Sequence, residues 1–473
     1  MSSTHIAVDI GASSGRLLVG TLQDQKIDLQ EVHRFQNAMI HRSGHLCWDV
    51  DDLFVEIKKG IRICHEKGFN PKTIGVDTWA VDFVLLDEEE QPLGPVVAYR
   101  DARTEGIMEK VTETLSKDDI YTSTGIQFQP FNTIYQFAAL RQSNPEILEK
   151  ARSFLMIPDY FHYLLTGKKV NEYTNATSTQ LLHADSKDWD QSLLNHLGIS
   201  RDLFEEIVLP GTSIGGLRKE LVHEFGFDLE VIVPATHDTA SAVAAIPEAK
   251  ETIYLSSGTW SLLGVENAEP ICDQKAQAYN FTNEGGVDYR FRFLKNIMGF
   301  WMIQEVKRLY GDIYSFDELV QASKKVKNPS IIDVDQQRFL NPVNMIEEIQ
   351  AACMESNQPM PVRSGEIAAC VFHSLVKSYQ AAILQIEEMV GRSYDQVNII
   401  GGGAQNEYVN QLVANVTGKT VISGPIEATA IGNLLVQMRA AGLISTLADA
   451  RELVAASFSL KQFIPQKGEI THG

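Results

Sequence analysis

Short apolar runs that are typical of β-strands alternate with longer segments of helical periodicity along the chain. Residues 5–9 and 16–20 have the apolar character of strands, and the small residues at 11–15 predict a tight turn between them. In residues 371–386, apolar side chains recur every three or four positions, which predicts one buried helix face that ends near Gly391. This alternation of strands and helices favours an α/β fold.

The same strand–turn–strand plan occurs a second time, about half a chain later. Residues 252–264 pass from one apolar strand through the small residues Ser256, Ser257 and Gly258 into another. Such a repeat predicts two similar domains, and 473 residues are too many for a single ordinary core. Because the helical pattern breaks at residues 246–251, we expect an N-terminal domain of residues 1–245 and a C-terminal domain of residues 246–473.

Composition and charge narrow the classes of partner. Acidic residues outnumber basic ones by 61 to 41, which gives a formal net charge of −20. A field of that sign repels polyanions, so we expect neither nucleic acid nor an anionic membrane as a partner. No run of 18 apolar residues is present and residues 1–9 lack the pattern of a signal peptide, so we expect the cytoplasm. No cysteine has zinc-ligand spacing, and whether Cys353 and Cys370 form a disulfide stays open.

The first turn has the chemistry of a phosphate-binding loop. Its small residues leave N–H groups and hydroxyls free to face an anion, and Asp9 on the preceding strand is placed to hold Mg²⁺ through water. The alternative is a plain hairpin turn in which Asp9 satisfies turn amides. Residues 11–15 also match the G-x-S-x-G elbow of serine hydrolases, with Ser13 as nucleophile. That elbow requires a following helix, whereas a strand is predicted here, so hydrolysis is kept only as the rival class.

A second candidate site follows a predicted strand at residues 231–233. There the chain enters a helix of small residues through His237, Asp238 and Thr239. Asp238 can either cap that helix or accept a proton from a substrate hydroxyl, and the spacing does not decide between these roles. The tripeptide at 418–420 is no P-loop, because Val413 stands where the first glycine is required.

Two further segments carry weaker signals. Glycines 401–403 join a strand to a helix and let a flat group such as adenosine approach the backbone. Residues 74–83 predict one strand that mixes acids with Trp79 and Phe83. Those aromatic side chains either form the apolar wall of a sugar site or belong to the core.

Taken together, these motifs resemble the FGGY family of carbohydrate kinases. The resemblance rests on 9–16, 77–83, 237–239, 256–260 and 401–403, and it extends over 99–101, 123–127, 130–132, 158–160, 172–177, 282–286 and 294–299. It therefore covers nearly the whole chain in order. It implies two actin-like (ribonuclease H-like) ATPase domains with ATP in an interdomain cleft.

The resemblance also implies an activity and its residues. The expected reaction transfers a phosphoryl group from ATP, with Mg²⁺, to the 1-hydroxyl of L-rhamnulose, and the expected enzyme is a monomer. Asp238 corresponds to the family's general base. The implied ATP contacts are Ala12, Ser13, Ser14, Gly15, Arg16, Thr259, Gln304 and Gly402. The implied sugar contacts are Trp79, Ala80, His237, Asp238, Thr239 and Asn296. Relatives often carry glycine at the position of Ala80, and the added methyl group can change substrate preference.

Three alternatives remain open from the residues. The first is a family kinase that acts on another ketose, such as L-fuculose. The second is the serine hydrolase that uses Ser13. The third is an actin-like scaffold that binds nucleotide without catalysis, because a fold does not fix a function.

Overall fold

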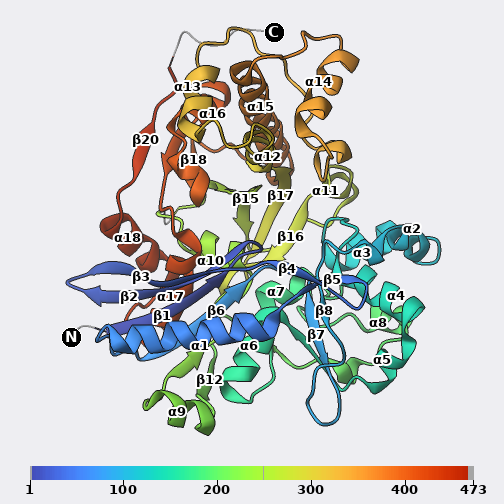
Figure 1. Cartoon of the computed structure of the whole chain (residues 1–473), viewed down its shortest axis with the longest axis vertical. Coiled ribbons are helices and arrows are strands. Elements are labelled where there is room, and N and C mark those ends of the chain that lie inside the picture. The colour runs from blue at the N-terminus through green and yellow to red at the C-terminus, as the bar shows by residue number, and fades with distance from the viewer. Residues whose placement is uncertain (1–2, 249, 467–473) are drawn as a thin grey trace. The chain divides into compact units, whose positions relative to one another are not determined.

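A computed structural model of the chain describes residues 3–248 and 250–466. These residues form two compact units that interleave along the chain. The first unit contains residues 3–248, 266–293 and 428–457, and the second contains residues 250–265, 294–427 and 458–466. Each unit has its own β-sheet and helices (Figure 1), so the α/β class with two sheet-containing domains is confirmed. The division into an N-terminal domain that ends at residue 245 and a C-terminal domain that begins at residue 246 stays a prediction.

The first unit is built around a sheet with the strand order β12-β13-β6-β1-β2-β3. Neighbours of β1 are β2, which is antiparallel, and β6, which is parallel, and the predicted first hairpin is therefore confirmed. Further out, β3 is antiparallel to β2, β13 is parallel to β6, and β12 is antiparallel to β13. The strands are β1 (Ser3–Ile10), β2 (Ser14–Gln23), β3 (Lys26–Gln36), β6 (Thr73–Thr78), β12 (Ser213–Gly216) and β13 (Glu230–Ile232).

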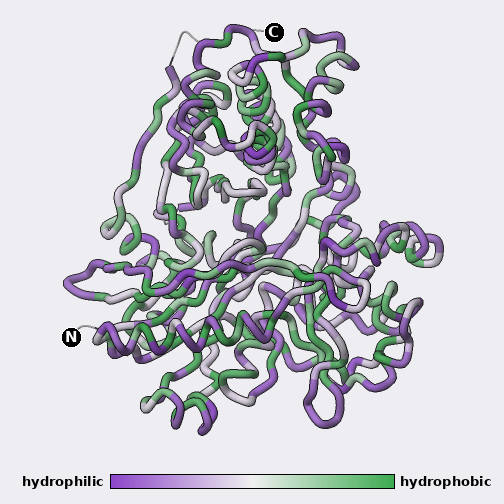
Figure 2. The backbone as a smooth tube through the Cα atoms, viewed as in Figure 1, coloured by the Kyte–Doolittle hydropathy of each residue, from purple (hydrophilic) through white to green (hydrophobic). Residues whose placement is uncertain are grey.

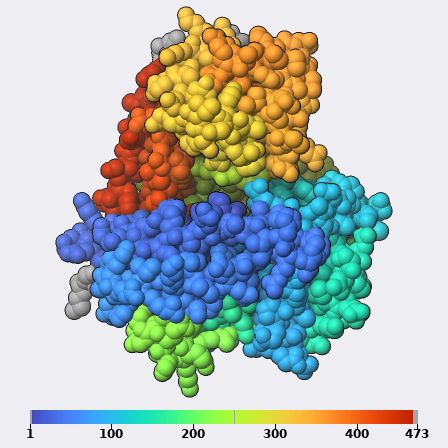
Figure 3. Space-filling model, viewed as in Figure 1, coloured from blue at the N-terminus to red at the C-terminus, as the bar shows by residue number. Residues whose placement is uncertain are grey.

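Helices cover both faces of this sheet. On one face, α1 (Val50–Glu66) contacts β2 and β3, α6 (Ile157–Thr166) contacts β6, and both helices share one apolar core with the sheet. Hydrophobic and hydrophilic residues alternate along α1 (Figure 2), and its outer side lies at the molecular surface (Figure 3). On the other face, α17 (Ala428–Ala440) contacts β1 and β6, and α10 (Asp238–Ala244) packs against α17. α18 (Leu447–Ser457) contacts β3.

A second apolar core of the first unit is rich in aromatic side chains. In that core, Phe154 contacts the rings of Phe83, Phe137, Trp189 and Phe204. The remaining strands are β4 (Met39–Arg42), β5 (His45–Trp48), β7 (Phe83–Leu86), β8 (Val96–Val97), β9 (Ser153–Met156), β10 (Asn171–Glu172), β11 (Ile207–Val208) and β16 (Thr282–Gly285). The remaining α-helices are α2 (Ile107–Thr112), α3 (Lys117–Thr124), α4 (Thr133–Ser143), α5 (Pro145–Lys150), α7 (Tyr173–Thr177), α8 (Gln191–Leu197), α9 (Lys219–Phe225) and α11 (Gln274–Ala278). Short 3₁₀ turns are η1 (Ala102–Thr104), η2 (Arg201–Leu203) and η3 (Val287–Tyr289).

The sheet of the second unit repeats the plan of the first. The five strands that correspond to strands of the first sheet lie in the order β15-β14-β18-β19-β20, with β17 beside β15. β14 is antiparallel to β15 and parallel to β18, β19 is parallel to β18, and β20 is antiparallel to β19. The sequence repeat of two hairpins is thus matched by a repeat of strand directions. These strands are β14 (Ile253–Ser257), β15 (Trp260–Asn267), β17 (Phe291–Met298), β18 (Gln396–Ile400), β19 (Thr420–Ser423) and β20 (Lys461–Phe463).

The predicted buried helix of the second unit is confirmed as α15 (Ser364–Val390), which ends at Gly391 with a φ of 73°. It is the one described helix long and apolar enough to cross a membrane, but its apolar stretch is mostly buried in the unit, as in many core helices, so this is weak evidence for a membrane span. Cys353 and Cys370 are free thiols with sulfur atoms 3.8 Å apart. The other helices are α12 (Trp301–Leu309), α13 (Phe316–Ser323), η4 (Gln337–Phe339), α14 (Met345–Glu355), η5 (Gly402–Gln405) and α16 (Glu407–Thr417).

The prediction of one continuous strand over residues 74–83 is wrong. β6 ends at Thr78 and β7 begins at Phe83, and the chain turns between them. Val81 has a φ of 66°, and its carbonyl accepts hydrogen bonds from Thr133 and Gln136 of α4. A partner distant in sequence therefore imposes the turn on residues that are locally suited to a strand.

Candidate active site

Three ionisable side chains, Asp9, Arg16 and Asp77, lie side by side near the carboxyl ends of β1 and β6. The strand register places Asp9 opposite Arg16 on β2 and opposite Asp77 on β6. Residues opposite each other across a sheet point to the same face, so these side chains are neighbours. Arg16 donates two hydrogen bonds to Asp9 Oδ2, of 3.1 Å and 2.9 Å. The predicted metal residue therefore has an arginine as its counter-ion.

The turn after Asp9 is fixed by its own backbone and by Asn37. The Gly11 N–H donates to the Ser14 carbonyl at 2.9 Å, and Asn37 Nδ2 donates to the Gly11 carbonyl at 2.9 Å. Ser13 is exposed at the tip of the turn. Because β2 begins at Ser14, a strand follows this serine, and no strand-to-helix elbow is formed. This geometry argues against the hydrolase alternative.

Asp77 is fully buried, and only one of its two carboxyl oxygens has a hydrogen-bond partner. Its Oδ2 accepts a hydrogen bond of 2.6 Å from Asn433 Nδ2 of α17, whereas its Oδ1 is buried without a hydrogen-bond partner. Burial, followed by the charge of Asp9, holds the pKa of Asp77 well above its usual value. The sequence contained Asp77 within a family motif, but its role was not predicted.

Asp238 is the first residue of α10, where the preceding loop runs beside the end of β6. The Thr78 N–H donates to the Thr236 carbonyl at 2.9 Å, which holds this loop to the sheet. The Asp238 side chain keeps 27% of its surface exposed, so a ligand can reach it. Burial of the rest, followed by the charge of Asp9, raises the pKa of Asp238 to about 7. A carboxyl group with this pKa can exchange a proton near neutral pH.

His237 and Thr239 flank Asp238 and are tied to a buried arginine. Arg292 Nη1 donates to Thr239 Oγ1 at 2.7 Å, and Nη2 lies 3.1 Å from His237 Nδ1. Nη2 also donates to Glu284 Oε2 at 3.0 Å. Burial, followed by the Arg292 charge, holds the pKa of His237 well below its usual value, so the imidazole is neutral. The sequence singled out His237 and Thr239 but not Arg292, which lies more than 50 residues away.

The loop before His237 is fixed by a second buried carboxylate that the sequence did not identify. Glu172 Oε2 accepts hydrogen bonds from the N–H of Thr236 at 3.1 Å and from its hydroxyl at 2.6 Å. The same carboxylate receives the N–H and the hydroxyl of Thr174, and the Thr174 oxygen receives the His237 N–H at 3.2 Å. Glu172 lies in the family motif 172–177, and this position in a motif was the signal in the sequence that could have pointed to it.

The predicted sugar wall at Trp79 is part of an aromatic cluster held by Asp82. The ring centroids of Trp79 and Trp48 are 4.3 Å apart. Asp82 Oδ2 accepts hydrogen bonds from the indole N–H of Trp48 at 2.6 Å, from that of Trp79 at 3.0 Å and from the Tyr99 N–H at 3.0 Å. Trp79 is buried, as the core interpretation expects, whereas Ala80 next to it is half-buried. Trp48 was not predicted from the sequence.

The remaining predicted residues lie in the second unit. Thr259 is in the turn between β14 and β15, and its carbonyl accepts the Trp301 N–H at 3.1 Å at the start of α12, which carries Gln304. Gly402 begins η5 directly after β18, and a side-chain carbon added there would meet no atom within 4 Å. At Gly403, the same carbon would lie 2.1 Å from Ser257 Oγ, so this glycine is needed for packing against β14. Asn296 is on β17.

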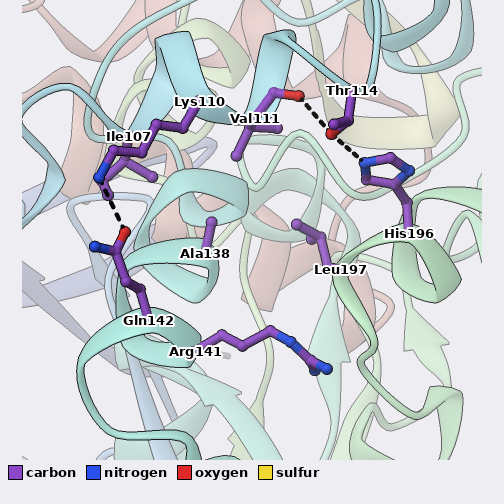
Figure 4. A pocket seen from close by; sticks show the side chains of 9 residues that line it. All are labelled: Ile107, Lys110, Val111, Thr114, Ala138, Arg141, Gln142, His196 and Leu197. Carbon is purple, nitrogen blue, oxygen red and sulfur yellow. Dashed lines mark hydrogen bonds between the residues drawn. The ribbon is translucent and has the colours of Figure 1, made fainter.

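Neither a metal-binding cluster nor a separate cavity adds a residue to this set. Residues 3–248 and 250–466 contain no group of three or more His, Cys, Asp or Glu side chains arranged to hold a metal. A cavity of about 270 Å³ lies between α2, α4 and α8 of the first unit (Figure 4). None of the predicted site residues lines it. Its lining residues are Ile107, Lys110, Val111, Thr114, Ala138, Arg141, Gln142, His196 and Leu197.

Comparison with known proteins identifies related sequences of nearly equal length. The N-terminal domain of the FGGY family of carbohydrate kinases matches residues 4–245, and the C-terminal domain matches residues 253–441. A protein of Halalkalibacterium halodurans named rhamnulokinase is 58% identical over 97% of this chain and 98% of its own length. Proteins of the same name are 56% identical in Oceanobacillus iheyensis, over 97% of this chain and 98% of theirs, and 46% identical in Bacillus subtilis, over 98% and 95%.

Solved structures support the fold. A ligand-bound xylulose kinase from Lactobacillus acidophilus superposes with a TM-score of 0.83 at 17% identity, over 98% of this chain and 94% of that one. The glycerol kinase of Plasmodium falciparum with ADP gives a TM-score of 0.77 at 16% identity, over 98% and 94%. These identities establish only that the fold is shared. The two family domains together match most of the chain, and the chain belongs to the FGGY family of carbohydrate kinases.

Proposed function

We propose that this kinase transfers the γ-phosphoryl group of ATP to the 1-hydroxyl of L-rhamnulose, giving L-rhamnulose 1-phosphate and ADP in L-rhamnose breakdown. Relatives named rhamnulokinase, at 46–58% identity over nearly the whole chain, support this acceptor. The observation that carries the chemistry is the accessible Asp238 carboxylate, whose pKa is raised to about 7. We further propose that the enzyme is a cytoplasmic monomer.

Asp238 acts as the general base in this proposal. A bond forms between the sugar O1 and the γ-phosphorus while the bond from that phosphorus to the β,γ-bridging oxygen breaks. The proton of the 1-hydroxyl passes to the Asp238 carboxylate, and ADP leaves with the bonding electrons. The remaining sugar contacts of the proposal are the Trp79–Ala80 segment, His237, Thr239 and Asn296. Here positioning and charge stabilisation do most of the work, as is usual for phosphoryl transfer.

The nucleotide is assigned to the small-residue turns and to the glycines. We propose ATP contacts at residues 12–16 and at Thr259, Gln304 and Gly402. The open space beside Gly402 and the exposure of Ser13 support these roles. Backbone N–H groups in turns of small residues are suited to phosphate oxygens.

Kinases of the FGGY family use ATP with a divalent metal ion, and we propose Mg²⁺ as that ion. The carboxylates present fit it, because Asp77 Oδ1 is a buried oxygen without a partner and Asp9 is its neighbour in strand register. Oxygen ligands, several of them water, are what Mg²⁺ prefers. Bound near Asp9, the ion would offset the negative charge of the β- and γ-phosphates. Arg16, which already pairs with Asp9, would add positive charge on the same side.

The first test is an ADP-release assay on Asp238→Asn with L-rhamnulose and Mg·ATP. We expect turnover to fall by about 10²-fold or more, the usual scale for a lost general base. Calorimetry should show nearly unchanged ADP affinity. The matched control is Asp49→Asn, at the N-cap of α1, where asparagine can still accept the Asp52 N–H. Turnover of Asp238→Asn close to that of the control would remove Asp238 from this role.

A further inference from the structure

Arg292 is an arginine with no exposed side-chain surface, and all its partners belong to the first unit. Nε donates to the Gly285 carbonyl at 2.9 Å. Nη1 reaches Thr239 Oγ1 at 2.7 Å, and Nη2 reaches both Glu284 Oε2 at 3.0 Å and His237 Nδ1 at 3.1 Å. The guanidinium therefore contacts both residues that flank Asp238, while Glu284 balances its charge.

The direction of each hydrogen bond follows from the chemistry of the groups. A guanidinium can only donate, so His237 Nδ1 must be the acceptor in its contact with Arg292. A neutral imidazole that accepts at Nδ1 carries its proton on Nε2. The Glu284 oxygen, 3.4 Å from Nδ1, could accept a hydrogen bond only from a protonated Nδ1, but it is farther from this nitrogen than Arg292 Nη2 at 3.1 Å and already receives a hydrogen bond from that Nη2. Arg292 thus selects one of the two tautomers of His237.

The tautomer in turn decides what Thr239 can offer to a ligand. His237 Nε2 lies 3.1 Å from Thr239 Oγ1, and its proton makes it the donor. Thr239 Oγ1 then accepts two hydrogen bonds, one from His237 and one from Arg292, which occupy both of its lone pairs. Its own hydroxyl proton stays free, and the residue is half-buried rather than enclosed.

We propose that Arg292, with Glu284 as its counter-ion, is a positioning residue that fixes His237 as the Nε2–H tautomer and makes Thr239 a hydrogen-bond donor toward the sugar. This inference rests on the proposed function, since it takes Thr239 as a sugar contact. Thr239 then favours a sugar oxygen that accepts a hydrogen bond. The backbone N–H of Thr239, which donates to Asp238 Oδ1 at 2.6 Å, places this donor next to the proposed base.

The chain offers a matched control for a buried arginine. Arg451 of α18 is also buried in the first unit and pairs with Glu266, and it donates to the Val243 carbonyl at 3.1 Å. It contacts neither His237 nor Thr239 in the structure. A purely structural role for Arg292 predicts that lysine at either position has the same kind of effect, namely a loss of stability alone.

The kinetic test compares Arg292→Lys with Arg451→Lys, using enzyme that remains folded by thermal melting. Lysine keeps the charge near Glu284 but lacks the planar fork that reaches Thr239 and His237 together. We expect Arg292→Lys to raise the KM for L-rhamnulose about 3- to 10-fold, the scale of a lost hydrogen bond between neutral groups, and to leave the KM for ATP within about 2-fold. Arg451→Lys should change neither KM. Equal KM values in the two variants would overturn the proposal.

The second readout does not depend on activity. In enzyme labelled with ¹⁵N-histidine, the His237 signal, assigned by its loss in His237→Gln, should show a protonated Nε2 and an unprotonated Nδ1 in the wild type. The tautomer preference should weaken in Arg292→Lys. If that variant does not fold, the paired change Arg292→Met/Glu284→Gln removes both charges together and is measured instead. A proton on Nδ1 of wild-type His237 would contradict the inference. If the predicted tautomer is found but no phosphoryl group is transferred to any ketose, the hydrogen-bond network proposed here stands and only the proposed function is refuted.

Discussion

Among single residues, Asp238 has the most important environment, because burial and the charge of Asp9 make ionisation of its carboxyl group unfavourable. Asp238 has a pKa of about 7 in the folded chain, against an ordinary value of 3.8. The folded state therefore retains this proton while the unfolded state loses it, and stability falls as the pH rises from about 4 to about 7. Above that range the ionised group opposes folding, which is a cost in stability.

This cost predicts that Asp238→Asn is more stable than the wild type at pH 8. Asparagine can still accept the Thr239 N–H, and it removes the charge that burial and Asp9 disfavour. We expect a gain of about 1–3 kcal/mol at pH 8, since one pKa unit corresponds to 1.36 kcal/mol and partial exposure of the side chain reduces the total. Urea unfolding at pH 8 and at pH 4.5 measures it. The gain should be several-fold smaller at pH 4.5, which lies only slightly above the ordinary pKa of 3.8, and an equal gain at both pH values would contradict this explanation.

The sequence singled out the candidate reacting residues but not the residues that hold them in place. Asp9, His237, Asp238 and Thr239 stand in short motifs whose chemistry can be recognised locally. Arg292 meets them only through the fold, because β16 and the start of β17 bring it beside the loop before α10. The individual roles predicted for the site residues, including the metal role of Asp9, stay predictions until they are measured.

At the scale of elements, the position of Asp238 depends on a close approach of α10 and α17. A side-chain carbon at Gly432 of α17 would lie 1.7 Å from the Ser241 carbonyl oxygen of α10. Neither backbone can yield without moving its helix. Glycine is therefore required where these two helices cross because a side chain would clash with the neighbouring backbone, and not because of an unusual backbone φ angle.

We predict that Gly432→Ala lowers both stability and kcat. Overpacking of this kind costs about 1–3 kcal/mol or more, and relief of the clash would displace the first turn of α10, which carries Asp238. The control is Gly60→Ala in α1, where the added carbon meets the Leu17 side chain, whose ends can move. Urea midpoints and turnover at saturating substrate should separate the two variants. Unchanged kcat in a destabilised Gly432→Ala would show that α10 is held by other contacts.

Elements with local signals were predicted well, and the failure had a nonlocal cause. Both hairpins and α15 followed from apolar periodicity and from glycine at a turn or a helix end. Residues 74–83 were mistaken for one strand because the bonds that turn the chain at Val81 come from α4, more than 50 residues later. Such a partner leaves no trace in the local pattern.

In the whole molecule, each of the two compact units is built from three separate segments of the chain, so no single boundary in the sequence divides them. The repeat of two hairpins predicted two domains, and five strands of one sheet match five strands of the other in order and direction. However, residues 266–293 and 428–457 belong to the first unit, where they supply Arg292 and Asn433. Sequence periodicity marks the sheets but does not indicate to which unit a later helix or strand returns.

The proposed reaction of this family member is phosphorylation of L-rhamnulose at its 1-hydroxyl. The most direct measurement is ³¹P NMR of the products formed from Mg·ATP with L-rhamnulose, L-fuculose or D-xylulose in parallel. We predict L-rhamnulose 1-phosphate in a 1:1 ratio with ADP. We also predict a kcat/KM for L-rhamnulose that exceeds those of the other ketoses by about 10-fold or more. A phosphate ester at another carbon, a better rival ketose, or ADP formed without any ester would contradict the account.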